Sequence, residues 1–110
     1  VDINSLNRDF YNFHRKLAPF GPHNMKPILM LKNQKISGIL KTMGKENNHV
    51  KFYLKQESTS RNIECLGFKL GKFADDFREK SFDIAFTIEE NHWKGNVTHY
   101  LNIKDVKFLF

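Results

Sequence analysis

The sequence predicts a mainly β fold with minor α structure. We expect a small five-stranded Greek-key barrel with one helix between its third and fourth strands and another helix before its first strand. Three observations lead to this prediction. Apolar residues recur every three or four positions near the start, as on one face of a helix. From residue 28 they alternate with polar residues, as in half-buried strands. A short segment around residue 74 returns to helical spacing before the alternation resumes.

The first predicted helix covers residues 1–18 and has one strongly apolar face. Its apolar positions are Ile3, Leu6, Phe10, Phe13 and Leu17. Such a face normally packs against other protein. Because the chain opens inside this helix, we expect a longer parent protein whose upstream part covers the face. Residues 19–27, Pro-Phe-Gly-Pro-His-Asn-Met-Lys-Pro, follow as a stiff connector, since their prolines fix φ. We therefore assign residues 1–27 to helix and connector and residues 28–110 to the barrel domain.

The barrel strands follow from the period-two pattern. They are predicted over residues 28–42, 49–55, 61–68, 82–89 and 96–107, with a loop over residues 90–95. The first strand is expected to break near Lys32-Asn33 or near Gly38. The helix between the third and fourth strands carries Phe73 and Phe77 on its apolar face. This order matches the OB fold, whose strands two and three and loops 1–2 and 4–5 form the ligand groove.

The charge pattern indicates a polyanionic partner. The sequence contains eighteen Lys and Arg and twelve Asp and Glu, which gives a formal net charge of +6 and a pI of about 9.5. Basic domains attract nucleic acid, although this net charge also suits an ordinary soluble surface. Residues 26–55 hold seven lysines and the single carboxylate Glu46, so a basic face is favoured over a uniform coat.

Single-strand binding needs cations along the backbone and aromatic faces for the bases. Lys51, Tyr53 and Lys55 alternate outward on the second strand, and Lys45 and Trp93 fall in the two groove loops. Alternatively, Tyr53 covers a barrel edge and Trp93 pins its loop against the core. The candidate DNA-binding residues are Lys35, Lys41, Lys45, Lys51, Tyr53, Lys55, Arg61, Lys69, Trp93 and Lys94.

Catalytic and metal sites are not indicated by the residues. The adjacent acids Asp75–Asp76 and Glu89–Glu90 point apart on a helix and on a strand, respectively. The five histidines lack a ligand spacing such as HExxH, although a composite site from His49 and His99 on neighbouring strands stays open. We interpret Cys65, the only cysteine, as a buried strand residue that behaves as a small apolar side chain. No apolar run approaches the roughly 20 residues that a membrane span needs, so no membrane contact is expected. A single cysteine cannot form an internal disulfide, which suits a reducing cytosol, and we therefore expect a cytoplasmic protein.

The connector and the strands together resemble the RecJ family of DHH single-stranded-DNA exonucleases. Residues 19–27 are similar to the family's Pro-Phe-Gly-x-Gly-Asn-x-x-Pro signature, with His23 in place of its second glycine. The remaining matches are His49–Leu54 for the second strand, Gly67-Phe68 before the helix, Asp83–Gly95 for the fourth strand and its Trp-x-Gly turn, and Leu101–Val106 for the fifth strand.

The resemblance implies the C-terminal OB domain of an enzyme that degrades single-stranded DNA from the 5′ end in DNA repair and recombination. The parent enzyme would use Mn²⁺ or Mg²⁺, held by an upstream domain with an Asp-His-His motif. That motif is absent here, so the resemblance implies neither a catalytic residue nor a cofactor in this fragment. Implied partners are single-stranded DNA and the upstream catalytic domains. Alternatives are a module that braces those domains or recruits a repair protein, and, as an outlier, a self-sufficient metal nuclease.

Overall fold

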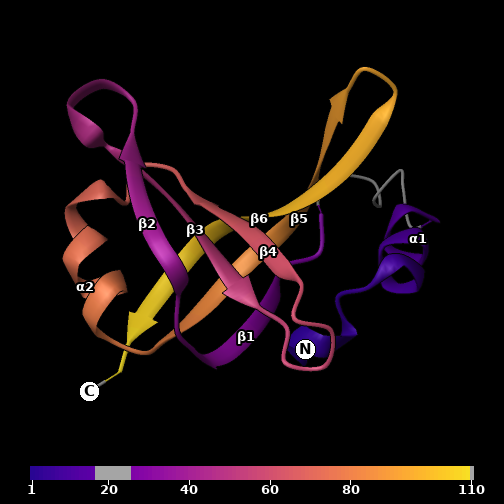
Figure 1. The fold of residues 1–110 in the computed structure, drawn as a ribbon, viewed down its shortest axis with the longest axis horizontal. Coiled ribbons are helices and arrows are strands. Elements are labelled where there is room, and N and C mark those ends of the chain that lie inside the picture. Colours follow the sequence, from indigo (N-terminus) through magenta and orange to yellow (C-terminus); the bar gives the residue numbers. More distant parts are fainter. Residues whose placement is uncertain (17–25, 110) are drawn as a thin grey trace.

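The structure is a computed structural model, and it describes residues 1–16 and 26–109 as one curled six-stranded sheet with two short α-helices (Figure 1). The predicted connector therefore lies largely outside the described residues, as does Leu17. The 3₁₀-helices (η), α-helices and strands in chain order are η1 (Ile3–Ser5), α1 (Arg8–Lys16), β1 (Leu29–Gln34), β2 (Ser37–Met43), η2 (Lys45–Asn47), β3 (His49–Lys55), β4 (Asn62–Gly67), η3 (Gly71–Phe73), α2 (Ala74–Glu79), β5 (Phe82–Trp93) and β6 (Asn96–Phe108).

The sheet topology confirms the predicted barrel with its helix before the last two strands. The strand order is β1-β5-β6-β4-β3-β2, and the β4–β6 pair is parallel whereas the others are antiparallel. β1 and β2 are the two edge strands of this order, yet they follow each other directly in the chain. The two edges of the sheet must therefore lie close together, which requires the sheet to curl into a barrel. Together β1 and β2 correspond to the one long strand predicted over residues 28–42.

The strand count differs from the prediction because this first strand serves both ends of the sheet. Its first half pairs with β5 and its second half with β3, so the chain must bend between them. The break falls at residues 35–36, between the two positions expected from sequence. The register against β5 already shifts after Leu31, where Asn33 adopts a φ of 55°.

The β5–β6 hairpin is longer than predicted. Strand structure runs through residues 90–93, which were expected to form a loop, and only Lys94 and Gly95 remain as the turn. Their φ angles of 48° and 80° are both positive, as the two central residues of a type I′ hairpin turn require. Trp93 thus stands at the end of a strand and close to the hairpin tip.

The core is built from the inward residues of the strands and from α2. Phe77 of α2 is fully buried, and its ring centroid lies 4.9 Å from that of Phe52 and 5.1 Å from that of Phe82. The predicted inward positions Leu101 and Ile103 are 0% and 5% exposed, which confirms the alternation expected for the last strand.

The predicted N-terminal helix is interrupted, and part of its apolar face packs on this barrel. Asn7 accepts a hydrogen bond of 2.9 Å from the amide of Phe10, which starts α1 afresh after η1. Leu6 is 1% exposed inside the barrel core, and Phe10 packs against that core, whereas Phe13 is 63% exposed. The expectation that upstream protein covers the entire face was therefore wrong for Leu6.

A helix that spans a membrane needs about 20 predominantly apolar residues. No helix within residues 1–16 and 26–109 is long and apolar enough to cross a bilayer.

Candidate nucleic-acid interface

One face of the sheet carries the side chains that alternate with the core residues of β3, β4 and β6. We call it the outer face. Strand register places its residues in rows that cross the strands. One row runs from Lys41 through Lys51 and Leu66 to Asn102, and the next runs from Tyr53 through Glu64 to Tyr100. The outer face consists of Lys41, Lys51, Tyr53, Lys55, Asn62, Glu64, Leu66, Tyr100 and Asn102.

Two tyrosines flank a carboxylate in the second of these rows. Tyr53 and Tyr100 are both half-buried, so each ring is held in place by its surroundings while part of it stays accessible. Tyr53 was predicted from its alternation with Phe52 and Leu54. Tyr100 was missed, although its position directly before the inward Leu101 was a usable signal. The arrangement offers two aromatic surfaces for stacking, one on β3 and one on β6, with β4 between them.

Lys51 and Glu64 form an ion pair on the outer face. The Lys51 Nζ lies 3.0 Å from Glu64 Oε1 and 6.0 Å from the centroid of the Tyr53 ring. The hydrogen bond to Glu64 raises the pKa of Lys51. By contrast, Lys41 and Lys55 are exposed and form no ion pair with another described residue.

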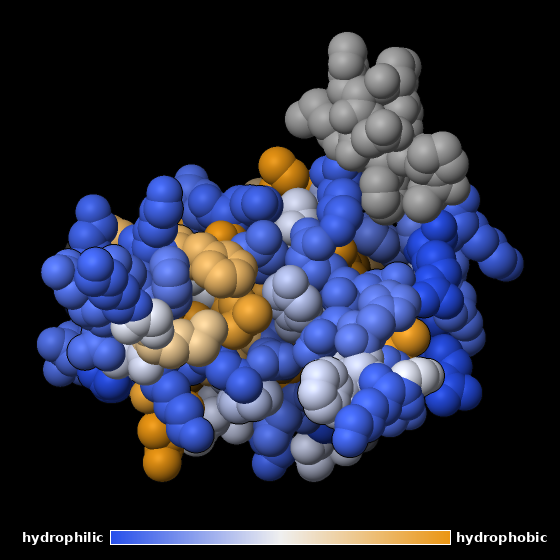
Figure 2. Space-filling model, turned by 90° about the horizontal axis from the view of Figure 1, so that it is seen from above, coloured by the Kyte–Doolittle hydropathy of each residue, from blue (hydrophilic) through white to orange (hydrophobic). Residues whose placement is uncertain are grey.

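Two hairpins project from the same side of the barrel (Figure 1). The β2–β3 connection carries Lys45, and the β5–β6 tip carries Trp93 and Lys94. Trp93 is 68% exposed, with Lys94 Nζ 5.5 Å from the centroid of its ring system, so the alternative that it pins the loop against the core is wrong. Figure 2 looks onto this side and shows apolar side chains gathered in its left half among hydrophilic ones.

The β2–β3 connection is held by contacts with the segment that follows β4. The amide of Gly71 donates to Asn48 O at 2.8 Å, and the amide of Lys69 donates to His49 Nδ1 at 2.8 Å. A Cβ added at Gly71 would lie 1.9 Å from Asn47 O, so this approach of two backbones requires glycine. The loop that carries Lys45 is thereby fixed relative to the sheet.

The ten predicted DNA-binding residues fall into three groups in the structure. Lys41, Lys51, Tyr53 and Lys55 lie together on the outer face, and Lys45, Trp93 and Lys94 lie on the two hairpins. The remaining three lie elsewhere: Lys35 at the bend between β1 and β2, Lys69 after β4, and Arg61 before β4.

The helix α1 attaches to the barrel beside the β5–β6 hairpin. Arg15 Nη2 lies 2.6 Å from Glu90 Oε2, and this hydrogen bond lowers the pKa of Glu90. Lys26 pairs with Glu89 on the same strand. Burial alone would raise the pKa of Glu89, but hydrogen bonds from Lys26 and Thr87 outweigh it and lower the pKa. The adjacent acids thus serve two separate ion pairs.

No donor set for a metal is formed by the described part of the chain. In residues 1–16 and 26–109, no three His, Cys, Asp or Glu side chains are grouped closely enough to hold an ion. His49 and His99 are not on neighbouring strands, because β4 separates β3 from β6. Cys65 is fully buried, as predicted, and burial raises the pKa of its thiol well above the ordinary value.

The family model described as the RecJ OB domain matches residues 1–105. Two structures of RecJ from Thermus thermophilus, one with Mg²⁺ and one with Mn²⁺, match 89% of this chain at 21% and 22% identity, each with a TM-score of 0.64. The chain spans 14% and 13% of those two proteins.

A further structural similarity is to an SSB domain from Synechococcus sp., with 8% identity and a TM-score of 0.54. This match covers 72% of this chain and 91% of the SSB domain. Comparison with curated protein sequences gives no match.

Proposed function

Because the chain belongs to the RecJ OB domain family, we propose that it holds single-stranded DNA for a RecJ-type exonuclease of which it forms one domain. Its own part in that enzyme is binding. The upstream catalytic domains would supply the metal ligands for Mn²⁺ or Mg²⁺ and would cleave the strand from its 5′ end. DNA repair, recombination and a cytoplasmic location belong to the same proposal.

The outer face is the observation that carries this proposal. Tyr53 and Tyr100 provide surfaces on which bases stack, and each stacked base contributes about 1–3 kcal/mol. Lys41 and Lys55 provide cations for the phosphates without a carboxylate partner among the described residues. OB folds of the SSB type bind single strands with this combination of parts, and the similarity to an SSB domain is consistent with it.

The distribution of the cations also favours binding without sequence preference. Lysine ammonium groups contact phosphates as point charges, and stacking tolerates every base because every base has a π-face. The Lys51–Glu64 pair occupies the middle of the outer face, so Lys51 is partly neutralised in the free protein. We therefore expect modest affinity that depends strongly on salt.

A second candidate function is a bracing or recruiting module, and the exposed Phe13 on α1 favours it. This ring is 63% exposed, while the neighbouring Phe10 packs on the barrel. A surface of this kind suits contact with the catalytic domains or with a repair protein. The two functions use different parts of the molecule, so substitutions can separate them.

Fluorescence anisotropy with a labelled oligothymidylate of about 12 nucleotides and a matching duplex tests the proposal. We expect preference for the single strand and a steep loss of affinity between about 50 and 200 mM salt. Lys51→Gln with Lys55→Gln should weaken binding severalfold. The matched control, Lys72→Gln with Lys80→Gln on the side of α2, lowers the net charge equally and should have little effect.

Equal loss in both double variants would mean that only net charge matters, which contradicts a specific DNA-holding face. No binding of the single strand at about 50 mM salt would favour the bracing function instead.

A further inference from the structure

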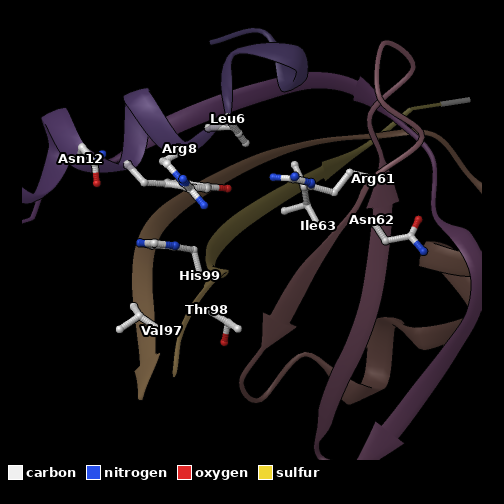
Figure 3. A pocket seen from close by; sticks show the side chains of 10 residues that line it. Leu6, Arg8, Asn12, Arg61, Asn62, Ile63, Val97, Thr98 and His99 are labelled. Carbon is white, nitrogen blue, oxygen red and sulfur yellow. The ribbon is translucent and has the colours of Figure 1, made fainter. Parts of the chain in front are cut away.

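A pocket of about 350 Å³ lies between α1, the start of β4 and the start of β6 (Figure 3). Arg8 of α1 and Arg61 beside β4 both line it, and in Figure 3 both guanidinium groups point into the space between these two elements. Asn12, Asn62 and Thr98 add polar groups, and none of the described residues that line the pocket is Asp or Glu.

The buried residue Gln56 positions both walls of this pocket, one through its side chain and the other through its backbone amide. Gln56 is 3% exposed, and its Nε2 donates to Ile3 O at 2.7 Å and to Leu6 O at 2.9 Å, which holds the segment that leads into α1. Its backbone amide donates to Arg61 O at 2.8 Å. One residue thereby fixes the positions from which Arg8 and Arg61 extend.

A neighbouring pocket of about 200 Å³ shares two lining residues, Tyr11 and His99, with this one. In that second pocket Arg15 pairs with Glu90 and Lys26 pairs with Glu89. Arg8 and Arg61, in contrast, form no ion pair with another residue of the described ranges. Two unneutralised cations in one pocket repel each other, and a shared anion would relieve that repulsion.

We propose that the Arg8–Arg61 pocket binds one phosphate group of a nucleic-acid strand that continues from the outer face. The guanidinium fork matches the oxygens of a phosphate and donates two parallel hydrogen bonds to it. Asn62 joins the two surfaces, because it lines the pocket and pairs in register with Lys55 of the outer face. The inference rests on the proposed function for the identity of the strand.

The first test compares Arg8→Gln, Arg61→Gln and the double variant in oligothymidylate binding, with Arg78→Gln as the matched control. Arg78 pairs with Asp75 on α2, at the opposite end of the molecule from α1 (Figure 1). The slope of log affinity against log salt should fall in magnitude by about 0.7 in the double variant, which is the loss of one phosphate contact. This change in slope corresponds to about eightfold weaker binding at 50 mM salt if the affinity at 1 M salt is unchanged.

The double variant should lose little more than the stronger single variant, because both guanidinium groups serve one phosphate. The Arg78→Gln chain should keep the slope of the unmodified protein. A double variant that behaves like Arg78→Gln, in a chain that still binds the oligonucleotide, would overturn the pocket proposal and leave the proposed function intact.

The second test needs no nucleic acid. Resonances of the arginine Nε–Hε groups are followed by NMR during titration with inorganic phosphate and, at equal ionic strength, with acetate. We expect Arg8 and Arg61 to shift with phosphate and much less with acetate, while Arg78 serves as the internal reference. Equal responses to acetate would indicate a site for carboxylates of an acidic peptide and would contradict the proposal.

The two tests separate the possible failures. If phosphate shifts the two arginines but the chain binds no oligonucleotide, the proposed function is refuted, and so is the claim that the bound phosphate belongs to a DNA strand. The pocket would then still be an anion-binding site. Oligonucleotides with a 5′-phosphate or a 5′-hydroxyl then distinguish the source of the phosphate. If the double arginine variant loses affinity for both oligonucleotides, the pocket binds a backbone phosphate. If it loses affinity only for the 5′-phosphorylated oligonucleotide, the pocket binds the terminal phosphate.

Discussion

The ring of Tyr11 on α1 stacks on the imidazole of His99 on β6, with centroids 4.0 Å apart and an interplanar angle of 8°. The stack lies next to the ion pair between Arg15 and Glu90, and both contacts join α1 to the barrel. Because these residues are about 75 to 90 positions apart in the chain, the first helix is bound to the sheet by tertiary contacts.

Removing the aromatic ring should loosen α1. Tyr11→Leu keeps an apolar side chain but loses the stack, which is worth about 0.5–1.5 kcal/mol. We expect faster hydrogen exchange at the α1 amides while the amides of β3 and β5 stay protected. Phe13→Leu is the control, since Phe13 is exposed on the same helix. Equal loss of protection in both variants would show that the stack does not hold the helix.

The attachment of α1 should weaken in acid. Burial is the main cause that lowers the pKa of both His14 and His99, and the pKa values of Glu89 and Glu90 are lowered too. A lowered pKa means that the fold favours the deprotonated form. These groups therefore stabilise the protein above their unfolded pKa values and lose that contribution as the pH falls through the folded values.

For the histidines the decline in stability should begin at about pH 6.5, and for the glutamates at about pH 4.3. Urea unfolding at a series of pH values measures it. The His99→Phe chain keeps an aromatic ring without a titrating group, so its stability should decline less between about pH 6.5 and 5. Greater stability at pH 5 than at pH 7 in the unmodified chain would contradict this account.

Much of the sheet was predictable because its strands have one buried face. The second predicted strand coincides with β3, since Val50, Phe52 and Leu54 alternate with polar residues. The interruption of the first helix was not predictable from periodicity, because Leu6 fits the helical spacing equally well. Only the structure shows that Asn7 begins a new helix and that Leu6 enters the barrel core.

The site was predictable within a strand but not across strands. Lys51, Tyr53 and Lys55 share a face of β3, and the alternation alone indicates this. Glu64 and Tyr100 join them only through the register of β4 with β3 and β6, and the β4–β6 pair is parallel. That register depends on how the barrel closes. Sequence reasoning had no access to it, so the carboxylate inside the outer face was missed.

Replacing that carboxylate should tighten DNA binding. Glu64→Gln removes a negative charge from the outer face and releases Lys51 from its 3.0 Å ion pair. We expect severalfold higher affinity for oligothymidylate and a steeper salt dependence, because one more cation can contact phosphate. Glu79→Gln on α2 changes the net charge equally and serves as the control. Unchanged or weaker binding of the Glu64→Gln chain would argue against DNA on this face.

The two tyrosines of the outer face should contribute through stacking. Tyr53→Leu and Tyr100→Leu should each weaken single-strand binding by about 1–3 kcal/mol, because each removes one aromatic surface. The salt slope should stay the same, since no charge is lost. Phe13→Leu removes an exposed ring away from this face and should not affect binding. Anisotropy titrations would refute the stacking role if all three variants bound alike.

The most direct test of the central claim is an NMR titration of the ¹⁵N-labelled chain with oligothymidylate, because it locates the contact surface residue by residue. If the outer face holds the strand, the largest amide shifts will fall on Lys51, Tyr53, Glu64 and Tyr100, with small shifts over α2. Shifts confined to α1 around Phe13, or spread evenly over every lysine, would contradict the assignment of this face to single-stranded DNA.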